Sequence, residues 1–131
     1  MGKFAGLAFI HAYLFEDIYD FAGKIRDVNI AKGSTAFARV IYLESSLKNI
    51  DAMPQSTFDD IVEKYVEMNV AHPFREGNGR ATRIWLDLML KKETQQVVDW
   101  NLVDKEEYLS AMQRSVVKDL EIKTLLKQAL T

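Results

Sequence analysis

One short stretch of this sequence brings together residue types that bind phosphates. Residues 72–83 read HPFREGNGRATR, with glycines on both sides of Asn78. Glycine admits a left-handed backbone and lets a ligand approach the main chain closely. A helical pattern follows, and the free N–H groups at a helix N-terminus favour anions, chiefly phosphates. Gly77, Asn78 and Gly79 are therefore predicted to form an anion-binding turn, although Gly-Asn-Gly alone is usually an ordinary turn.

Two arginines follow this turn at a spacing that places them on one face of the helix. Arg80 and Arg83 are three residues apart, one turn inside the helix start. Guanidinium groups match phosphate oxygens in a two-pronged geometry. Two cations at the positive end of a helix dipole are unfavourable unless an anion lies nearby. This local electrostatic conflict is itself a sign of function. The alternative for Arg83 is an ordinary ion pair with Asp87, four residues on.

An acid and a base lie beside the turn. Glu76 directly precedes the glycines, and a carboxylate beside bound phosphates is the usual arrangement for Mg²⁺. His72 ends the preceding helical pattern, where an imidazole could accept a proton from a hydroxyl near neutral pH. In isolation, a His before a Pro more often caps a helix. Taken together, these residues indicate transfer of a group from a magnesium nucleotide to a hydroxyl.

The elements that must position these residues are predominantly helical, since apolar residues recur with a helical period along most of the chain. About six helices around one core are predicted, in an all-α fold with a short β-hairpin flap. Tyr19 to Arg26 are predicted to continue the first helix as a short helix or turn. The helices are expected over 4–20, 40–51, 56–71, 78–92, 104–116 and 119–130.

Caps and breaks fix several of these ends. Ser56 is predicted to cap the third helix, with Asp59 three residues on, and Pro73 to end it. Asp104 with Glu107 is predicted to cap the fifth helix. The first helix is expected to bury Leu7, Ile10, Leu14 and Ile18, and the third to bury Phe58, Ile61, Val62 and Tyr65.

Residues 27–38 (DVNIAKGSTAFA) lack a helical period. Val28 and Ile30 alternate with polar neighbours, and Lys32-Gly33-Ser34 is typical of a turn. A short hairpin or extended flap is predicted here. Because one hairpin alone is marginally stable, it must lean on the helices.

Composition limits the remaining possibilities. The chain has 131 residues, which fits one domain over 1–131. A net charge of -2 with scattered basic residues argues against nucleic acid or an anionic membrane as partner. The absence of cysteine excludes disulfides and thiolate metal sites, and two histidines are too few for a multi-histidine metal centre. The sequence has neither a signal peptide nor a membrane-spanning run, so the cytoplasm is the expected compartment.

The motif resembles the active-site signature of the Fic (filamentation induced by cAMP) family. That signature is His-Pro-Phe-x-(Asp/Glu)-Gly-Asn-Gly-Arg-x-x-Arg, and HPFREGNGRATR meets every specified position. Residues 13–26 (YLFEDIYDFAGKIR) resemble the family's first conserved helix and turn, and residues 29–33 (NIAKG) resemble the approach to its flap. The resemblance covers nearly the whole chain.

The resemblance implies a protein adenylyltransferase that moves AMP from ATP to a Tyr, Ser or Thr hydroxyl and releases pyrophosphate. His72 would be the general base and Glu76 would hold Mg²⁺. Gly77, Asn78 and Gly79 would form the anion hole, with Asn78 also contacting the α-phosphate; Arg80 would contact the β-phosphate and Arg83 the γ-phosphate. The flap residues Gly33, Ser34, Thr35, Ala36 and Phe37 would hold the target backbone as an added strand. The target would be a protein bearing a hydroxyl, such as a topoisomerase subunit, or the chain itself.

Two departures from the family's pattern bear on specificity and regulation. Where relatives often have Arg-Phe-Ala-Pro in the flap, this chain has AFAR at 36–39, so its grip on a target is expected to differ. The family's inhibitory motif, (Ser/Thr)-x-x-x-Glu-(Gly/Asn), does not occur; Ser115 is followed four residues later by Asp119. The resemblance therefore implies a core trimmed at both ends, or a short form that an inhibitory partner regulates.

Two other functions remain open. The chain could be a nucleotide-binding toxin or interaction module controlled by a partner protein. It could also remove AMP from modified proteins, but in relatives that reaction uses the inhibitory Glu, which is missing here.

Five other residues are interpreted structurally. His11 is expected to be a partly buried helix residue, and Trp85 and Met89 to belong to the core. Trp100 is expected to pack rather than to lie near an adenine, and Tyr108 could line the nucleotide pocket or not.

Overall fold

The helical periodicity is realised as six α-helices within residues 2–32 and 35–131, the part of the chain that the computed structural model describes. An antiparallel hairpin of two short strands and one 3-10 turn complete the elements of that part, so the predicted all-α fold with a flap is confirmed. The elements are α1 (Phe4–Phe15), β1 (Ala31–Lys32), β2 (Thr35–Ala36), α2 (Val40–Ala52), α3 (Phe58–Ala71), α4 (Asn78–Thr94), η1 (Trp100–Leu102), α5 (Lys105–Ser115) and α6 (Leu120–Gln128).

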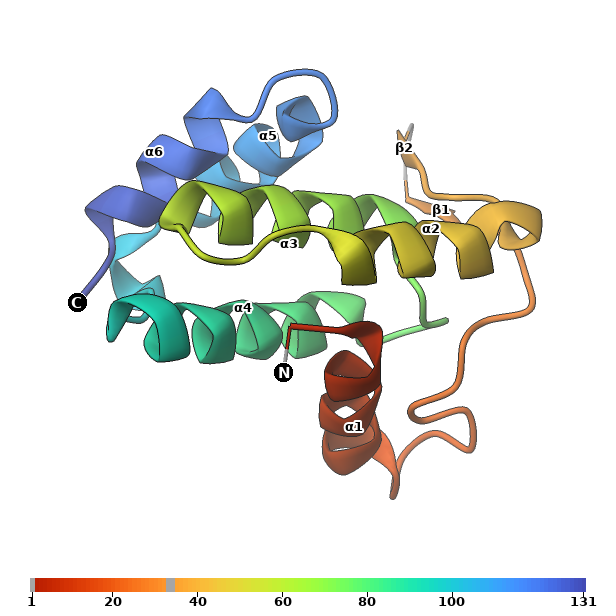
Figure 1. Cartoon of the computed structure of the whole chain (residues 1–131). Coiled ribbons are helices and arrows are strands. Elements are labelled where there is room, and N and C mark those ends of the chain that lie inside the picture. Colours follow the sequence, from red (N-terminus) through yellow and green to blue (C-terminus); the bar gives the residue numbers. More distant parts are fainter. Residues whose placement is uncertain (1, 33–34) are drawn as a thin grey trace.

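Helices α3 and α4 form the centre of the molecule and run side by side in opposite directions (Figure 1). Helix α1 packs on α4, α2 packs on α3, and α5 packs on α6. Ile61, Tyr65 and Met68 of α3 and Trp85 and Met89 of α4 are all at most 1% exposed. Each large apolar side chain buried in this way contributes about 1.5–3 kcal/mol to folding. The interface between α3 and α4 therefore fixes the two ends of the loop that joins them, which is residues 72–77.

Helix α3 begins one residue later than Ser56 would place it. Thr57 is the N-cap: its hydroxyl accepts from the Asp60 N–H at 3.1 Å, and the Asp60 carboxylate accepts from the Thr57 N–H at 3.3 Å. Ser56 with Asp59 and Thr57 with Asp60 have the same capping-box spacing. The reciprocal bonds show that the second pair caps the helix. The Asp104 cap of α5 is confirmed, since its carboxylate accepts from the Glu107 N–H at 2.9 Å.

Helix α1 ends at Phe15, five residues before the predicted end, and turns follow it to Gly23. Ile18 is therefore 69% exposed rather than part of the buried face. Glu16 and Asp17 occur where the negative end of the helix dipole disfavours carboxylates. The turn has a role in the site, because it brings Gly23 and Arg26 back against the helices.

The hairpin flap pairs Ala31 with Ala36 and Lys32 with Thr35. Gly33 and Ser34, two of the predicted target-binding residues, lie outside the described residues. The base of the flap leans on α3 as predicted, because the Ala38 N–H donates to the Val70 carbonyl at 3.0 Å.

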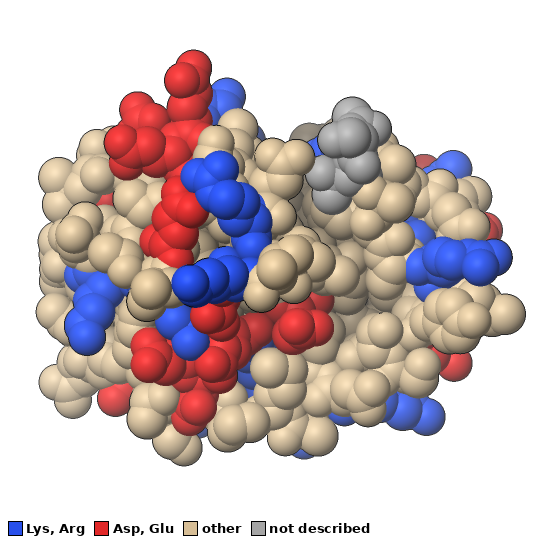
Figure 2. Space-filling view, turned by 90° about the horizontal axis from the view of Figure 1, so that it is seen from above, with Lys and Arg blue, Asp and Glu red and all other residues tan. Residues whose placement is uncertain are grey.

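The surface over α5 and α6 carries both acidic and basic side chains. Figure 2 shows acidic and basic side chains next to one another on the face that carries α5 and α6. Arg114 pairs with Glu121 at 2.6 Å, and Lys123 with Glu63 at 2.9 Å. Of the helices in the described residues, none is long and apolar enough to cross a membrane.

Candidate active site

The loop from His72 to Gly77 begins where α3 ends. His72 is the C-cap, with a left-handed φ of 49°, and Pro73 prevents the helix from continuing. The guanidinium of Arg26, only 2% exposed, donates to the carbonyls of His72 at 2.7 Å and Ala71 at 3.0 Å. A cation at the carboxyl end of a helix is electrostatically favourable. Arg26 thus holds the backbone of His72.

Arg26 also ties the flap to the same point. Its Nη1 donates to the Val28 carbonyl at 2.7 Å and its Nη2 to the Ala38 carbonyl at 2.5 Å, on the two sides of the hairpin. Its own N–H donates to the Pro73 carbonyl at 2.8 Å. One buried side chain therefore fixes the flap against the start of the motif.

The side chain of Asn78 closes the loop. Its Oδ1 accepts from the Phe74 N–H at 2.9 Å, and its Nδ2 donates to the Phe74 carbonyl at 2.6 Å. Phe74 is fully buried and anchors the loop in the core. The amide of Asn78 therefore shapes the loop, and its backbone N–H lies in the first turn of α4, where no intrahelical partner exists.

Gly77 is required by its surroundings. Its φ is +79°, and a Cβ at this position would lie 2.5 Å from the Phe15 ring of α1. Both observations restrict the position to glycine. The turn thus packs directly against α1 at the N-terminus of α4.

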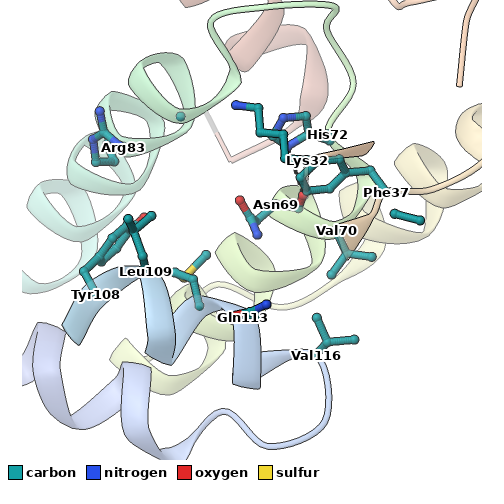
Figure 3. Close-up of a pocket in the computed structure, with 13 residues that line it drawn as sticks. Lys32, Phe37, Asn69, Val70, His72, Arg83, Tyr108, Leu109, Gln113 and Val116 are labelled. Atoms are coloured by element: carbon teal, nitrogen blue, oxygen red, sulfur yellow. Dashed lines mark hydrogen bonds between the residues drawn. The ribbon is translucent and has the colours of Figure 1, made fainter. Parts of the chain in front are cut away.

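A cavity of about 400 Å³ opens next to the turn (Figure 3). His72, Gly79 and Arg83 border it from the motif, Lys32, Ala36 and Phe37 from the flap, and Tyr108, Leu109 and Met112 from α5. In Figure 3, His72 and Arg83 lie on opposite sides of the opening. Residues of the motif, the flap and α5, three separate parts of the sequence, therefore meet at this cavity.

His72 has the geometry of a base. Its ring is 6% exposed, and Nδ1 lies 3.3 Å from the Asn69 carbonyl. A carbonyl only accepts, so the proton resides on Nδ1 and Nε2 carries the free lone pair. Burial lowers the pKa of His72 to about 4, against a smaller raising effect of the Asn69 bond, and the positive charges of Lys32 and Arg26 add to the lowering. The ring is therefore neutral near pH 7, with a lone pair on Nε2.

Arg83 is held toward the cavity by aromatic residues. Its guanidinium lies 5.9 Å from the centre of the Trp100 ring, and its positive charge acts to lower the pKa of the neighbouring Tyr108 hydroxyl. Tyr108 also hydrogen-bonds Tyr65, and burial raises the pKa of both phenols. The Arg83–Asp87 ion pair that the spacing allowed does not form between these two described residues. The Asp87 carboxylate accepts instead from the Val98 N–H and the Trp100 indole, each at 3.0 Å.

The structure places the aromatic residues that the sequence analysis singled out. Tyr108 lines the cavity. Trp100 packs, meeting Tyr108 edge-on with ring centres 5.6 Å apart, and Trp85 and Met89 belong to the core as predicted.

Glu76 and Arg80 are exposed at the turn and do not border the cavity. Within the described residues no Lys or Arg pairs with the Glu76 carboxylate, and no cluster of three metal-ligating side chains occurs. A single unpaired carboxylate beside the turn predicted to bind anions fits Mg²⁺, which takes one or two protein oxygens and completes its shell with water and phosphate.

His11 is the residue whose role sequence reasoning missed. It is fully buried rather than partly buried, and it hydrogen-bonds the Glu76 carbonyl at 2.7 Å. Burial lowers the pKa of His11. Its only sequence signal is a lone polar residue in an otherwise apolar helix, FAGLAFIHAYLF.

The profile of the Fic/DOC family matches residues 4–90 of the chain. The chain belongs to the Fic/DOC family. The probable protein adenylyltransferase Fic of Escherichia coli (strain K12) is 34% identical over 125 residues, which cover 85% of this chain and 60% of that protein. The protein adenylyltransferase VbhT of Bartonella schoenbuchensis is 36% identical over 118 residues, which cover 78% of this chain and 23% of that protein. The chain thus spans less than two thirds of either relative.

Solved structures share the fold. The N-terminal Fic domain of a Bartonella effector protein from Bartonella sp. AR 15-3 superposes with a TM-score of 0.87 at 18% identity, covering 100% of this chain and 72% of that one. BepC from Bartonella tribocorum, solved with bound AMPPNP, gives a TM-score of 0.80 at 20% identity, covering 98% of this chain and 74% of that one.

Proposed function

We propose that residues 1–131 act as one catalytic domain that transfers AMP from ATP to a hydroxyl of a protein and releases pyrophosphate. The observation that carries the proposal is the shared cavity of His72 and Arg83, a neutral base and a cation beside the N-terminus of α4. Two similar proteins bear the name adenylyltransferase, and the related BepC structure holds an ATP analogue. We expect the reaction in the cytoplasm, where ATP is available.

In this proposal the triphosphate lies against the first turn of α4. The N–H groups of Gly77, Asn78 and Gly79 bind phosphate oxygens, and the favourable end of the helix dipole adds to the attraction. Arg80 binds the β-phosphate and Arg83 the γ-phosphate. The adenosine part occupies the cavity beneath the flap, where Leu109, Met112 and Val116 supply apolar contacts.

The chemistry then needs one proton transfer and one displacement at phosphorus. His72 Nε2 accepts the proton of the target hydroxyl, whose oxygen attacks the α-phosphorus. The bond between the α-phosphorus and the oxygen that bridges to the β-phosphate breaks, and pyrophosphate leaves. Glu76 would hold Mg²⁺, which when bound offsets negative charge on the phosphates. The N–H groups of the turn are fixed in advance and stabilise the charge that develops.

The flap supplies the target's binding site. The outer edge of a two-stranded hairpin offers unpaired N–H and C=O groups to an extended peptide. Thr35, Ala36 and Phe37 lie on that hairpin or directly after it, with Phe37 against His72. Gly33 and Ser34 belong to the same proposed surface. A peptide bound there would place its hydroxyl next to the base.

The test is incubation of the protein with Mg²⁺, ATP labelled at the α-phosphate and a bacterial lysate. Labelled proteins are expected, and His72→Ala should lower the rate by about 10²–10⁴-fold. Mass spectrometry of the labelled bands identifies the target, for which a topoisomerase subunit and the chain itself are the first candidates. Absence of label with the wild type would overturn the proposal.

The second candidate function is that of a toxin or interaction module under the control of another protein. In that case the partner protein would cover the cavity. Leu109 and Val116 border the cavity and are 55% and 59% exposed, and the adjoining Val117 is 93% exposed. An apolar segment of a partner or of an inhibitory helix could cover them. Calorimetry that finds ATP binding without turnover would favour this role. Removal of AMP from modified proteins ranks last, because the inhibitory motif does not occur within residues 1–131.

A further inference from the structure

His11, in the third turn of α1, is fully buried and uses both ring nitrogens. Its Nδ1 accepts a hydrogen bond from the Gly23 N–H at 2.9 Å, so this nitrogen carries no proton. Its Nε2 lies 2.7 Å from the carbonyl oxygen of Glu76, which can only accept. The proton of the ring therefore resides on Nε2, and the tautomer is dictated by the two partners.

The turn after α1 fixes the ring in this orientation. Gly23 has a φ of +76°, and a Cβ there would lie 3.0 Å from the Ala12 Cβ and 3.1 Å from the Ala8 carbonyl. This close approach brings the Gly23 N–H onto the ring. One face of the His11 ring stacks on the Phe74 ring, with ring centres 3.8 Å apart and planes 12° apart. The imidazole has no freedom to rotate away from Glu76.

We propose that His11 is a positioning residue that orients the Glu76–Gly77 peptide of the phosphate-binding turn. In a trans peptide the C=O and the following N–H point in opposite directions, and no cis peptide occurs in the described residues. Since His11 holds the Glu76 carbonyl toward α1, the Gly77 N–H points away from α1. The inference rests on the proposed function, in which that N–H binds phosphate.

An external anchor is needed because the residue after this peptide is glycine. Gly77 tolerates left- and right-handed backbone alike, so its own conformational preference does not prevent rotation of the peptide. A rotated peptide would present the Glu76 carbonyl to the bound phosphates in place of an N–H. The bond from His11, made in a buried environment, is what excludes that state.

Three variants of the full chain separate positioning from mere stability. His11→Phe keeps the ring that stacks on Phe74 but removes both hydrogen bonds. His11→Gln restores one donor and one acceptor. Leu7→Ala is the matched control, since Leu7 lies four residues earlier on α1 and is fully buried in the core. ATP affinity with Mg²⁺ is measured by calorimetry, AMP transfer with α-labelled ATP, and folding by thermal unfolding.

We expect His11→Phe to weaken ATP binding by about 10-fold and to lower kcat/KM by about 100-fold, the size that a misplaced site residue produces. His11→Gln should recover part of both, and Leu7→Ala should leave both unchanged despite its lower melting temperature. A folded His11→Phe that matches the wild type, or losses equal to those of Leu7→Ala, would overturn the inference. If His11→Phe does not fold, the comparison of His11→Gln with Leu7→Ala decides in the same way.

Nitrogen NMR of the wild-type imidazole supplies a test that needs no variant. The pattern of a neutral ring protonated at Nε2 supports the inference, and a ring protonated at Nδ1 or at both nitrogens contradicts it. Measuring ATP binding and AMP transfer separately distinguishes a failure of the proposed function from a failure of the inference. A wild type that binds ATP but transfers no AMP overturns the proposed function, while the ATP affinities of the variants still decide the role of His11. A wild type that binds no ATP overturns both.

Discussion

The ring of Phe37 lies flat against the ring of His72, with centres 3.7 Å apart and planes 9° apart. Phe37 follows the flap, whereas His72 ends α3, so the stack joins the proposed target-binding surface to the proposed base. The contact also keeps water from one face of the imidazole. Burial, the main cause of the low pKa of His72, thus depends partly on the flap.

The pH profile expected for AMP transfer by the wild-type protein follows from this burial. Protonated His72 cannot accept a proton, so kcat/KM should fall as the pH falls through the pKa of about 4. Above about pH 5 the base is neutral and its contribution to kcat/KM should be level. Steady-state rates between acidic and neutral pH, paired with NMR titration of the His72 ring, check this. An acid limb centred near 6.5 would show that the base is solvated.

Phe37→Ala should shift the acid limb of the pH profile to higher pH. Removing the aromatic ring exposes His72 to water, so its pKa should rise toward the ordinary value of 6.5. The activity lost at mildly acidic pH should then exceed the activity lost at neutral pH. A variant with lower activity but an unshifted profile would mean that Phe37 acts only on the target.

Arg26→Met should destabilise the fold strongly. The guanidinium donates to four backbone carbonyls, and hydrogen bonds from charged donors contribute about 1.5–3 kcal/mol each. We expect a loss of at least about 3 kcal/mol in the free energy of unfolding, measured by urea denaturation. The matched control is Arg39→Met, because Arg39 is exposed, and it should change the free energy by less than about 0.5 kcal/mol. Equal effects of the two substitutions would contradict the role of Arg26.

Tyr108→Phe tests the support of Arg83. The variant keeps the ring against Trp100 but removes the hydroxyl that hydrogen-bonds Tyr65 and interacts with the charge of Arg83. With Arg83 less well oriented, KM for ATP should rise, and the unpaired Tyr65 hydroxyl should cost about 1–3 kcal/mol of stability. Arg83→Ala should raise KM further. If Tyr108→Phe binds ATP like the wild type, Arg83 does not need this support.

Gly77→Ala should damage both folding and activity. The methyl group would lie 2.5 Å from the Phe15 ring in a backbone with φ of +79°. Strain of this kind costs about 1–3 kcal/mol, and relief by shifting the turn would move its N–H groups. The same substitution at Gly6, within α1 and without a positive φ, should leave AMP transfer unchanged. Thermal unfolding and labelled-AMP transfer measure the two effects.

The helices could be predicted because their signals are local. Apolar periodicity located all six, and Pro73 and Asp104 mark boundaries through their immediate neighbours. The two helix ends that were predicted wrongly, the start of α3 and the end of α1, also depend on local features. Ser56 and Thr57 offer the same cap in adjacent registers, and α1 stops at Phe15 where apolar residues such as Ile18 still keep the period.

The motif residues could be identified from types and spacing, but their supports could not. His11 bonds Glu76 across 65 residues, and Arg26 bonds His72 across 46. Such contacts arise only when α1 and its turn pack on the loop between α3 and α4, which no periodic pattern encodes. Asn78 is the intermediate case: its place in the turn was predictable, whereas its two bonds to Phe74 require the folded loop.

The central claim is tested most directly by comparing two labels in one reaction with Mg²⁺ and lysate proteins. ATP labelled at the α-phosphate should label protein with the wild type and give little label with His72→Ala. ATP labelled at the γ-phosphate should give no more labelled protein with the wild type than with lysate alone, because that phosphate leaves in pyrophosphate. More protein labelled from the γ-position with the wild type than with lysate alone, or equal α-labelling by wild type and His72→Ala, would contradict the account.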